Sequence, residues 1–298
     1  MRRREFITLV GAAAAWPLGL RAQEPGRTYR LGGLTPSPRD APHYVALFGE
    51  LRRLGFIEGQ NLTVDWRGYG LRTEQFPEIA VELIKAKVDV IFCAGDAAVR
   101  AAQQATATIP ILAVTDDMVG SGLVRSLAQP GGNTTGVSIF ATELDGKRQD
   151  ILIEAVPGLR RLVALADPNA TTPQHLQALQ DAARARGVEL SIRRVAKSEE
   201  VVPAIDAAKT SHAAALNVLS SPLLFAERRV IIERTAALRL PAVYQWPEIA
   251  EEGGLIAYGP RISQMFRDLG GQQLIKLFRG AKPTDLPGRT ADAVRAGH

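Results

Sequence analysis

From residue 27 onward, the sequence alternates between short apolar segments typical of strands and longer amphipathic segments typical of helices. The segment "VDVIFCAG" is continuously apolar and ends in a turn signal, as expected for a strand that helices cover on both faces. In "HYVALFGELRRLG" the apolar residues recur on one helical face, and Gly55 suits the C-terminal cap. Strands that alternate with helices predict mostly parallel sheets with helices on both faces.

The expected strands number about ten and fall into two series of similar length. The junctions near 138–146 and 246–254 are typical of crossings between two lobes. We therefore predict an α/β protein with two Rossmann-like lobes joined by a hinge, although one doubly wound sheet could also hold the strands. The first lobe is expected to comprise 27–140 plus 254–280, and the second 141–253.

Three further elements are expected from local patterns. A short helix is predicted at 121–128, and a long helix is predicted from Ser221-Pro222 to Leu238. The helical segment "SEEVVPAIDAAKT" contains Pro203, which predicts an interruption because proline cannot donate a backbone hydrogen bond.

The charge and cysteine content exclude several classes of partner. The net charge is +5, but residues 1–22 hold four Arg and one Glu and so contribute +3, which leaves +2 for the rest of the chain. Basic residues do not cluster there, and we predict no nucleic-acid partner. The single cysteine, Cys93, is interpreted as a small core residue. One cysteine and four scattered histidines give no Cys/His zinc spacing, so no metal site is predicted.

The first 22 residues have the layout of a secretory signal peptide. Arg2–Arg4 form a basic start, residues 6–20 are apolar, and Ala22 is a small residue suited to cleavage. The apolar part is too short for a comfortable membrane span. The order Arg3-Arg4-x-Phe6 resembles the twin-arginine export pattern, with an ordinary Sec signal as the alternative. We predict cleavage near Ala22 and an exported mature chain.

Polar, acidic and aromatic residues gather where the predicted strands end. Parallel α/β sheets bind ligands beyond the carboxyl ends of their strands. For each residue, capping of the next helix is the alternative. Acidic and aromatic groups together favour a cationic or amphipathic small molecule. The predicted ligand-binding residues are Thr35, Ser37, Gly95, Asp96, Thr115, Asp116, Asp117, Asn169, Ser220, Tyr244 and Trp246.

Specific roles follow for four of these residues. Asp117 is expected first to cap the turn by accepting N–H groups near Gly120. Asp116 is expected to face the ligand and hold an amino group, although it could instead face water. Tyr244 and Trp246 end one strand, and at least one ring is expected to stack on the ligand, with core packing as the alternative.

The sequence lacks the signatures of three enzyme classes. No G-x-G-x-x-G follows the first strand, no P-loop occurs, and no G-x-S-x-G elbow is present. The histidines do not fall at a strand end beside a nucleophile. We therefore predict no catalytic residues, no cofactor and no enzymatic activity.

Several motifs resemble a known family. "LRRLGFIEGQNLTVDWR", "DDMVGSGLVRSLAQPGGNTTGVS", "ELDGKRQDILIEAVP" and "GGLIAYG" resemble the substrate-binding subunits of ABC-type importers, in the periplasmic group whose better-known members take up aromatic amino acids. The resemblance implies a type I-like periplasmic binding fold that closes over a small ligand. It also implies a periplasmic monomer that hands its ligand to an ABC permease in the inner membrane. A periplasmic sensor module and, less favoured, an exported α/β enzyme are the alternatives.

The sequence departs from the family pattern at two places. Family members commonly have Asp-Pro where this chain has Asp117-Met118, which makes the turn less rigid. The family pattern also continues with a further strand and helix where residues 288–298 form a short polar segment. We expect this segment to be an atypical, truncated tail.

Overall fold

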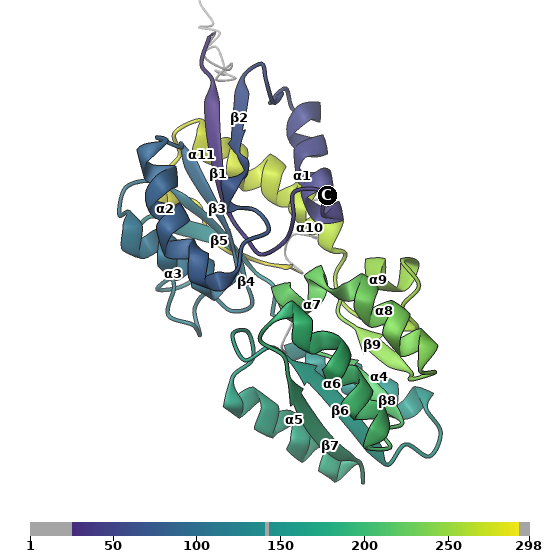
Figure 1. Cartoon of the computed structure of the whole chain (residues 1–298). Coiled ribbons are helices and arrows are strands. Elements are labelled where there is room, and N and C mark those ends of the chain that lie inside the picture. Colours follow the sequence, from purple (N-terminus) through teal and green to yellow (C-terminus); the bar gives the residue numbers. More distant parts are fainter. Residues whose placement is uncertain (1–25, 141–142, 292–298) are drawn as a thin grey trace, which may run out of the picture.

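Two parallel β-sheets form two α/β lobes in the computed structural model, which describes residues 26–140 and 143–291 (Figure 1). The sheet of the first lobe has six strands in the order β11-β5-β4-β3-β1-β2. Its strands are β1 (Tyr29–Leu34), β2 (Leu62–Asp65), β3 (Val90–Ala94), β4 (Ile111–Thr115), β5 (Thr134–Ser138) and β11 (Arg289–Thr290).

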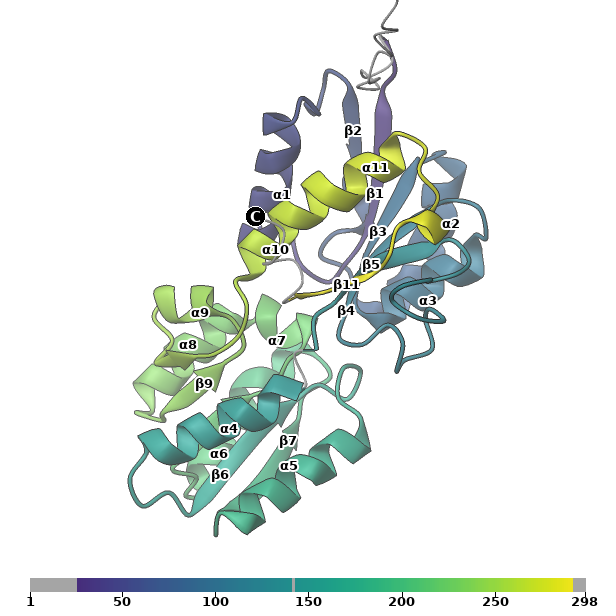
Figure 2. The same ribbon diagram turned by 180° about the vertical axis from the view of Figure 1, so that it is seen from behind.

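Helices cover both faces of this first sheet. The first face packs against α1 (Pro42–Arg53), α10 (Ile262–Leu269), the π-helical turn η4 (Gly270–Leu274) and α11 (Ile275–Phe278). The second face packs against α2 (Phe76–Lys85) and α3 (Asp96–Ala105). Figure 2, which views the molecule from behind, shows α10 and α11 in front of the first sheet, beside α1. Strand β3 is therefore covered on both sides, as its continuous apolar run predicts.

The sheet of the second lobe has five parallel strands in the order β10-β9-β8-β6-β7. Its strands are β6 (Arg161–Ala166), β7 (Glu189–Arg194), β8 (Ala215–Val218), β9 (Ala242–Tyr244) and β10 (Ile256–Ala257). Its helices are α4 (Glu143–Ala155), α5 (Pro173–Ala185), α6 (Val201–Thr210), α7 (Pro222–Ala226), α8 (Arg228–Ala237) and α9 (Pro247–Glu251). Side chains of α4 and α5 cover one face of the sheet, and those of α6 and α8 cover the other.

The chain crosses between the lobes after β5 and again after β10. We expected the return at residue 254, which is wrong, because Ile256 and Ala257 pair with Val243 and Tyr244 at the edge of the second sheet. Part of the expected tail also belongs to a sheet, since β11 pairs with β5 at Val137. Residues 292–298 of that expected tail lie outside the described residues.

Three local predictions are also wrong. Residues 121–128 form turns instead of a helix, and the backbone of Gly122 has a φ of +68°, which is incompatible with a right-handed helix. The long helix after Ser221 is two helices, α7 and α8, separated at Glu227. Pro203 lies in the first turn of α6, where its missing N–H would have no intrahelical partner, and it does not interrupt the helix.

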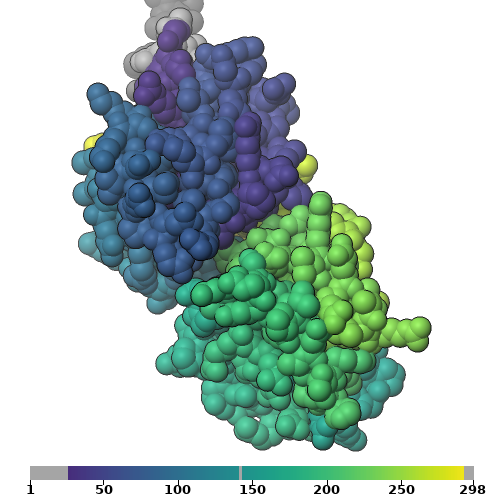
Figure 3. Space-filling model, viewed as in Figure 1, coloured from purple at the N-terminus to yellow at the C-terminus, as the bar shows by residue number. Residues whose placement is uncertain are grey.

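The two lobes touch through apolar and aromatic side chains. The core on the α1 face of the first sheet continues into the second lobe, where it includes Val218 and Phe225. The ring of His43 on α1 lies 5.2 Å from the ring of Phe225 on α7. Figure 3 shows the two lobes in contact along this junction. In the part of the chain that the structure describes, no helix has the length and apolar character needed to cross a membrane.

Candidate functional site

The carboxyl ends of strands from both sheets meet at the junction between the lobes. Gly95 follows β3 of the first lobe, and Pro222 begins α7 after β8 of the second lobe. A Cβ atom placed on Gly95 would lie 3.5 Å from Pro222 Cγ, which is van der Waals contact. Figure 1 places α7 between the lobes. Residues at these strand ends therefore come together from two halves of the chain, although they are far apart in sequence.

At the end of β1, the predicted polar residues already have partners. The Thr35 hydroxyl oxygen accepts hydrogen bonds from the Tyr44 hydroxyl at 2.6 Å and from the Ser37 N–H at 3.1 Å. Thr35 and Ser37 are both buried. Burial also raises the pKa of Tyr44, whose hydrogen bond to Thr35 opposes part of that shift. Thr35 thus fixes the shape of this loop.

The ends of β3 and β4 supply the acidic part of the site. Asp117 Oδ1 accepts hydrogen bonds from the N–H groups of Val119 at 3.0 Å and Gly120 at 2.9 Å, so it caps this turn as predicted. The side chain of Asp116, one residue earlier, is half-buried. Asp96 is the first residue of α3. The preceding residue, Gly95, has a φ of +89°, which favours glycine, and it has no side chain that could cap the helix.

Thr115, the last residue of β4, presents an unusual hydroxyl. Its side chain is only 2% exposed, and its Oγ1 has no hydrogen-bond partner among the described residues. A buried hydroxyl without a partner costs about 1–3 kcal/mol. A ligand oxygen or nitrogen at the lobe junction would supply the missing partner.

The second lobe contributes Asn169 and Ser220 from loops after β6 and β8. Asn169 is exposed, and its N–H donates to Asp167 Oδ1 at 2.8 Å. Burial raises the pKa of Asp167, and the Ser221 hydroxyl, which donates to Asp167 Oδ2 at 2.7 Å, offsets part of this shift. Ser220 Oγ accepts a hydrogen bond of 2.8 Å from Arg148 Nη2.

The two aromatic residues predicted to stack on a ligand are buried in the second lobe. Tyr244 is 1% exposed, and its hydroxyl lies 3.0 Å from Thr235 Oγ1. Burial raises the pKa of Tyr244. Trp246 is 5% exposed and belongs to the same apolar core. Their placement favours the core-packing alternative for both rings.

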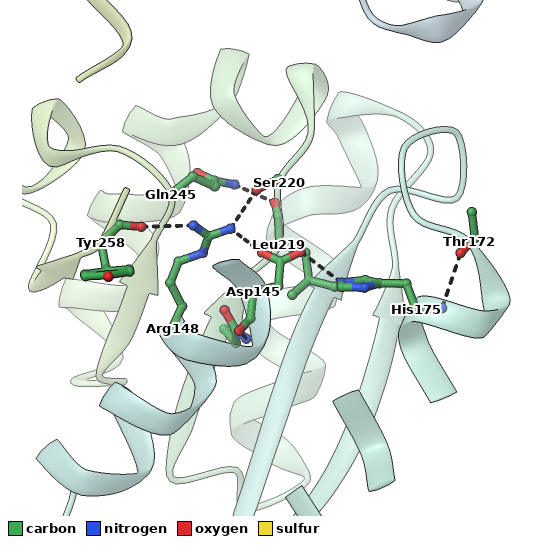
Figure 4. Close-up of polar contacts among 9 residues, drawn as sticks. Asp145, Arg148, Thr172, His175, Leu219, Ser220, Gln245 and Tyr258 are labelled. Atoms are coloured by element: carbon green, nitrogen blue, oxygen red, sulfur yellow. Dashed lines mark hydrogen bonds and ion pairs between the residues drawn. The ribbon is translucent and has the colours of Figure 1, made fainter. Parts of the chain in front are cut away.

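Two features near the junction were not predicted from the sequence. Asp145 and Arg148 on α4 form a fully buried ion pair (Figure 4). Their spacing of three residues is common on exposed helix surfaces, so the sequence carries no signal that this pair is buried. The second feature is His43 in the first turn of α1. It lies among Tyr44, Phe225 and Phe266, and Nδ1 has no hydrogen-bond partner among the described residues.

The chemistry of these groups suits binding. Within 26–140 and 143–291, no group of three or more His, Cys, Asp or Glu side chains could hold a metal ion. Cys93 is buried, and burial raises the pKa of its thiol, so its nucleophilic thiolate form is disfavoured. The strand ends instead present hydrogen-bonding groups from both lobes.

Comparison with known proteins gives a family and a fold. A family model described as "ABC transporter substrate binding protein" matches residues 45–296. A relative named "Tyrosine-binding protein" from Clostridioides difficile is 26% identical over 246 residues, which cover 80% of this chain and 68% of that protein.

Two solved structures are similar in fold. One is a conserved domain protein from Vibrio cholerae, with a TM-score of 0.77, 21% identity and coverage of 89% of this chain and 88% of that one. The other is an ABC domain in complex with L-Trp from Streptococcus pneumonia, with a TM-score of 0.72, 19% identity and coverage of 88% and 89%. These similarities, together with the two parallel sheets, confirm the predicted class of two α/β lobes of the type I periplasmic binding kind.

Proposed function

The chain belongs to the ABC transporter substrate-binding protein family, and on this basis we propose that it is the exported solute-binding component of an ABC importer. It binds a small ligand between its lobes, in the periplasm, and delivers it as a monomer to a permease in the inner membrane. The observation that carries the proposal is the meeting of strand ends from both sheets, where Gly95 of one lobe lies beside Pro222 of the other.

We propose an amino acid, and specifically an aromatic one, as the ligand. The support is the relative named as tyrosine-binding, which is similar over most of this chain. Asp116, with Thr115 beside it at the end of β4, holds the amino group of the ligand. The carboxylate lies toward the second lobe, near the loop that contains Ser220.

Thermal-shift and calorimetric titration of the purified protein test this proposal. L-tyrosine and L-tryptophan are compared with aliphatic amino acids and with aromatic acids that lack an amino group. Ligand at a hundred times its Kd should add about 2.7 kcal/mol of apparent stability. Tight binding of an aromatic acid without an amino group would contradict the role of Asp116. Failure of every amino acid to bind would overturn the proposed ligand class.

A further inference from the structure

A buried ion pair lies directly beneath the predicted ligand-binding loop of the second lobe. Asp145 Oδ1 and Arg148 Nη2 are 2.5 Å apart, and neither side chain has any exposed surface. Such a pair is expensive to bury, and apolar residues of similar size are often at least as stabilising. Stability alone therefore does not explain why Asp145 and Arg148 are buried together. The other hydrogen bonds of these two side chains indicate what the pair does.

The guanidinium of Arg148 joins three separate segments of the chain (Figure 4). Its own helix, α4, is the first element after the chain enters the second lobe. Nη1 donates to the backbone oxygen of Tyr258 at 2.9 Å, and Tyr258 directly follows β10, where the chain starts its return to the first lobe. Nη2 also donates to Ser220 Oγ at 2.8 Å. One side chain thus connects both crossings to a strand end at the lobe junction.

The carboxylate of Asp145 is held from its other side as well. Its Oδ2 lies 3.1 Å from His175 Nε2 on α5, and His175 is itself placed by the cap that Thr172 forms. These contacts fix the carboxylate that orients Arg148. The planar fork of an arginine suits this task, because it presents several N–H groups in fixed directions.

The donor and acceptor roles at Ser220 follow from this geometry. Arginine can only donate, so Ser220 Oγ accepts, and the hydroxyl proton must point away from the guanidinium. No acceptor for that proton is found among the residues that the structure describes. The neighbouring Ser221 differs, because its hydroxyl donates to Asp167 and accepts from the Leu224 N–H. Within the described residues, therefore, Ser220 is the one of these two serines whose hydroxyl proton has no acceptor.

We propose that Arg148 is a positioning residue that makes Ser220 a hydrogen-bond donor to a carboxylate oxygen of the bound amino acid. Through Tyr258 it also fixes the start of the return crossing, so the binding loop and the crossing move together. The role of Ser220 rests on the proposed function, since it needs an amino-acid ligand. The role at Tyr258 does not need a ligand.

The first experiment compares L-tyrosine with tyramine, which keeps the ring and the amine but lacks the carboxylate. Calorimetric titration of Ser220→Ala should show L-tyrosine binding weakened roughly tenfold or more, as for a lost hydrogen bond to a charged group. Tyramine binding should be unchanged. Arg148→Met should show the same selective loss, and Arg148→Lys should recover only part of it, because an ammonium lacks the planar fork.

A matched control is available on the same helix. Gln149 is also fully buried, and its Nε2 donates to the Leu179 backbone oxygen at 3.1 Å, away from the junction. Gln149→Met should lower the melting temperature without changing the ratio of the two Kd values. Equal weakening of both ligands by Ser220→Ala, or a change in that ratio in Gln149→Met, would overturn the assignment.

The second experiment needs no ligand. The Tyr258 N–H donates to the Tyr244 backbone oxygen at 3.1 Å, so its hydrogen exchange reports on the start of the return crossing. Exchange of this amide should be faster in Arg148→Met than in Gln149→Met. Equal exchange in both variants would refute the positioning role. If no amino acid binds to the wild-type protein, the proposed ligand class and the role of Ser220 fail together, while hydrogen exchange of the Tyr258 N–H still tests the role of Arg148 at Tyr258.

Discussion

Acidification should lower the free energy of unfolding through His43, a histidine that the folded protein keeps in its neutral form. His43 is 3% exposed, and its ring lies 4.6 Å from the ring of Phe266 and 5.2 Å from that of Phe225. Burial, together with the nearby positive charge of Arg228 on the second lobe, lowers the pKa of His43 to about 3. Phe225 belongs to the second lobe too, so the junction itself helps to keep this imidazole neutral.

The sign and size of the effect follow from proton linkage. The unfolded chain binds a proton at a pKa near 6.5, whereas folded His43 resists protonation until about pH 3. The contribution to stability is therefore complete above pH 6.5 and is lost progressively as the pH falls toward 3. Between pH 7 and pH 5, this single group should remove about 2 kcal/mol from the free energy of unfolding.

Chemical denaturation of wild type and His43→Phe at pH 7 and pH 5 measures this contribution. Phenylalanine keeps a ring among its aromatic neighbours but cannot be protonated. The stability lost between the two pH values should be about 2 kcal/mol smaller in His43→Phe, because every other titratable group is the same in both proteins and its contribution cancels. His43→Leu serves as a second variant if the larger ring does not fit. Equal losses in wild type and both variants would show that His43 does not make this contribution.

Three further predictions concern the strand ends and the N-terminus. Asp117→Asn should lower the free energy of unfolding by about 1 kcal/mol without weakening amino-acid binding. Asp116→Asn should weaken amino-acid binding much more than it lowers stability. Chemical denaturation and calorimetric titration measure the two effects, and the opposite pattern would contradict both roles. Trp246→Ala should cost about 3–5 kcal/mol of stability by leaving a core cavity, and unchanged stability with lost binding would instead restore the stacking role. N-terminal sequencing of the periplasmic fraction should find Gln23 first, and recovery of an uncleaved chain from the cytosol would exclude export.

The alternation of apolar and amphipathic segments was sufficient to predict mostly parallel α/β sheets, and the similar length of the two series favoured two lobes over one doubly wound sheet. Each strand of a parallel sheet carries its own signal, because burial on both faces demands a short apolar run such as Val90–Ala94. The return crossing was harder to locate. "LIAYG" supplies only two paired residues, Ile256 and Ala257, and a short edge strand differs little in sequence from a connecting segment.

The placement of polar side chains at the strand ends was predictable, but most of their hydrogen-bond partners were not. Strand ends place Thr35, Asp117 and Ser220 near the junction, because parallel strands expose their carboxyl ends on one side. Whether each of these side chains can still form a hydrogen bond with a ligand depends on partners that are distant in the sequence. Thr35 is engaged by Tyr44, nine residues away, and Ser220 by Arg148, 72 residues away. Sequence spacing alone does not reveal such contacts, since they arise from the packing of elements that are not consecutive.

Hydroxyl groups that can still form a hydrogen bond with a ligand lie on both lobes, so ligand binding should favour closure of the lobes. In the first lobe, Thr115 Oγ1 is buried and has no partner among the described residues. In the second, the Ser220 hydroxyl accepts from Arg148 and has a proton still to donate. Leaving the buried Thr115 hydroxyl without a partner costs about 1–3 kcal/mol, whereas Ser220 Oγ already accepts one hydrogen bond. A ligand that reaches only one lobe can bond to one of these hydroxyls, whereas an amino acid that spans the junction can bond to both. We therefore expect the closed arrangement to be favoured by ligands with a polar group at each end and not by those with one.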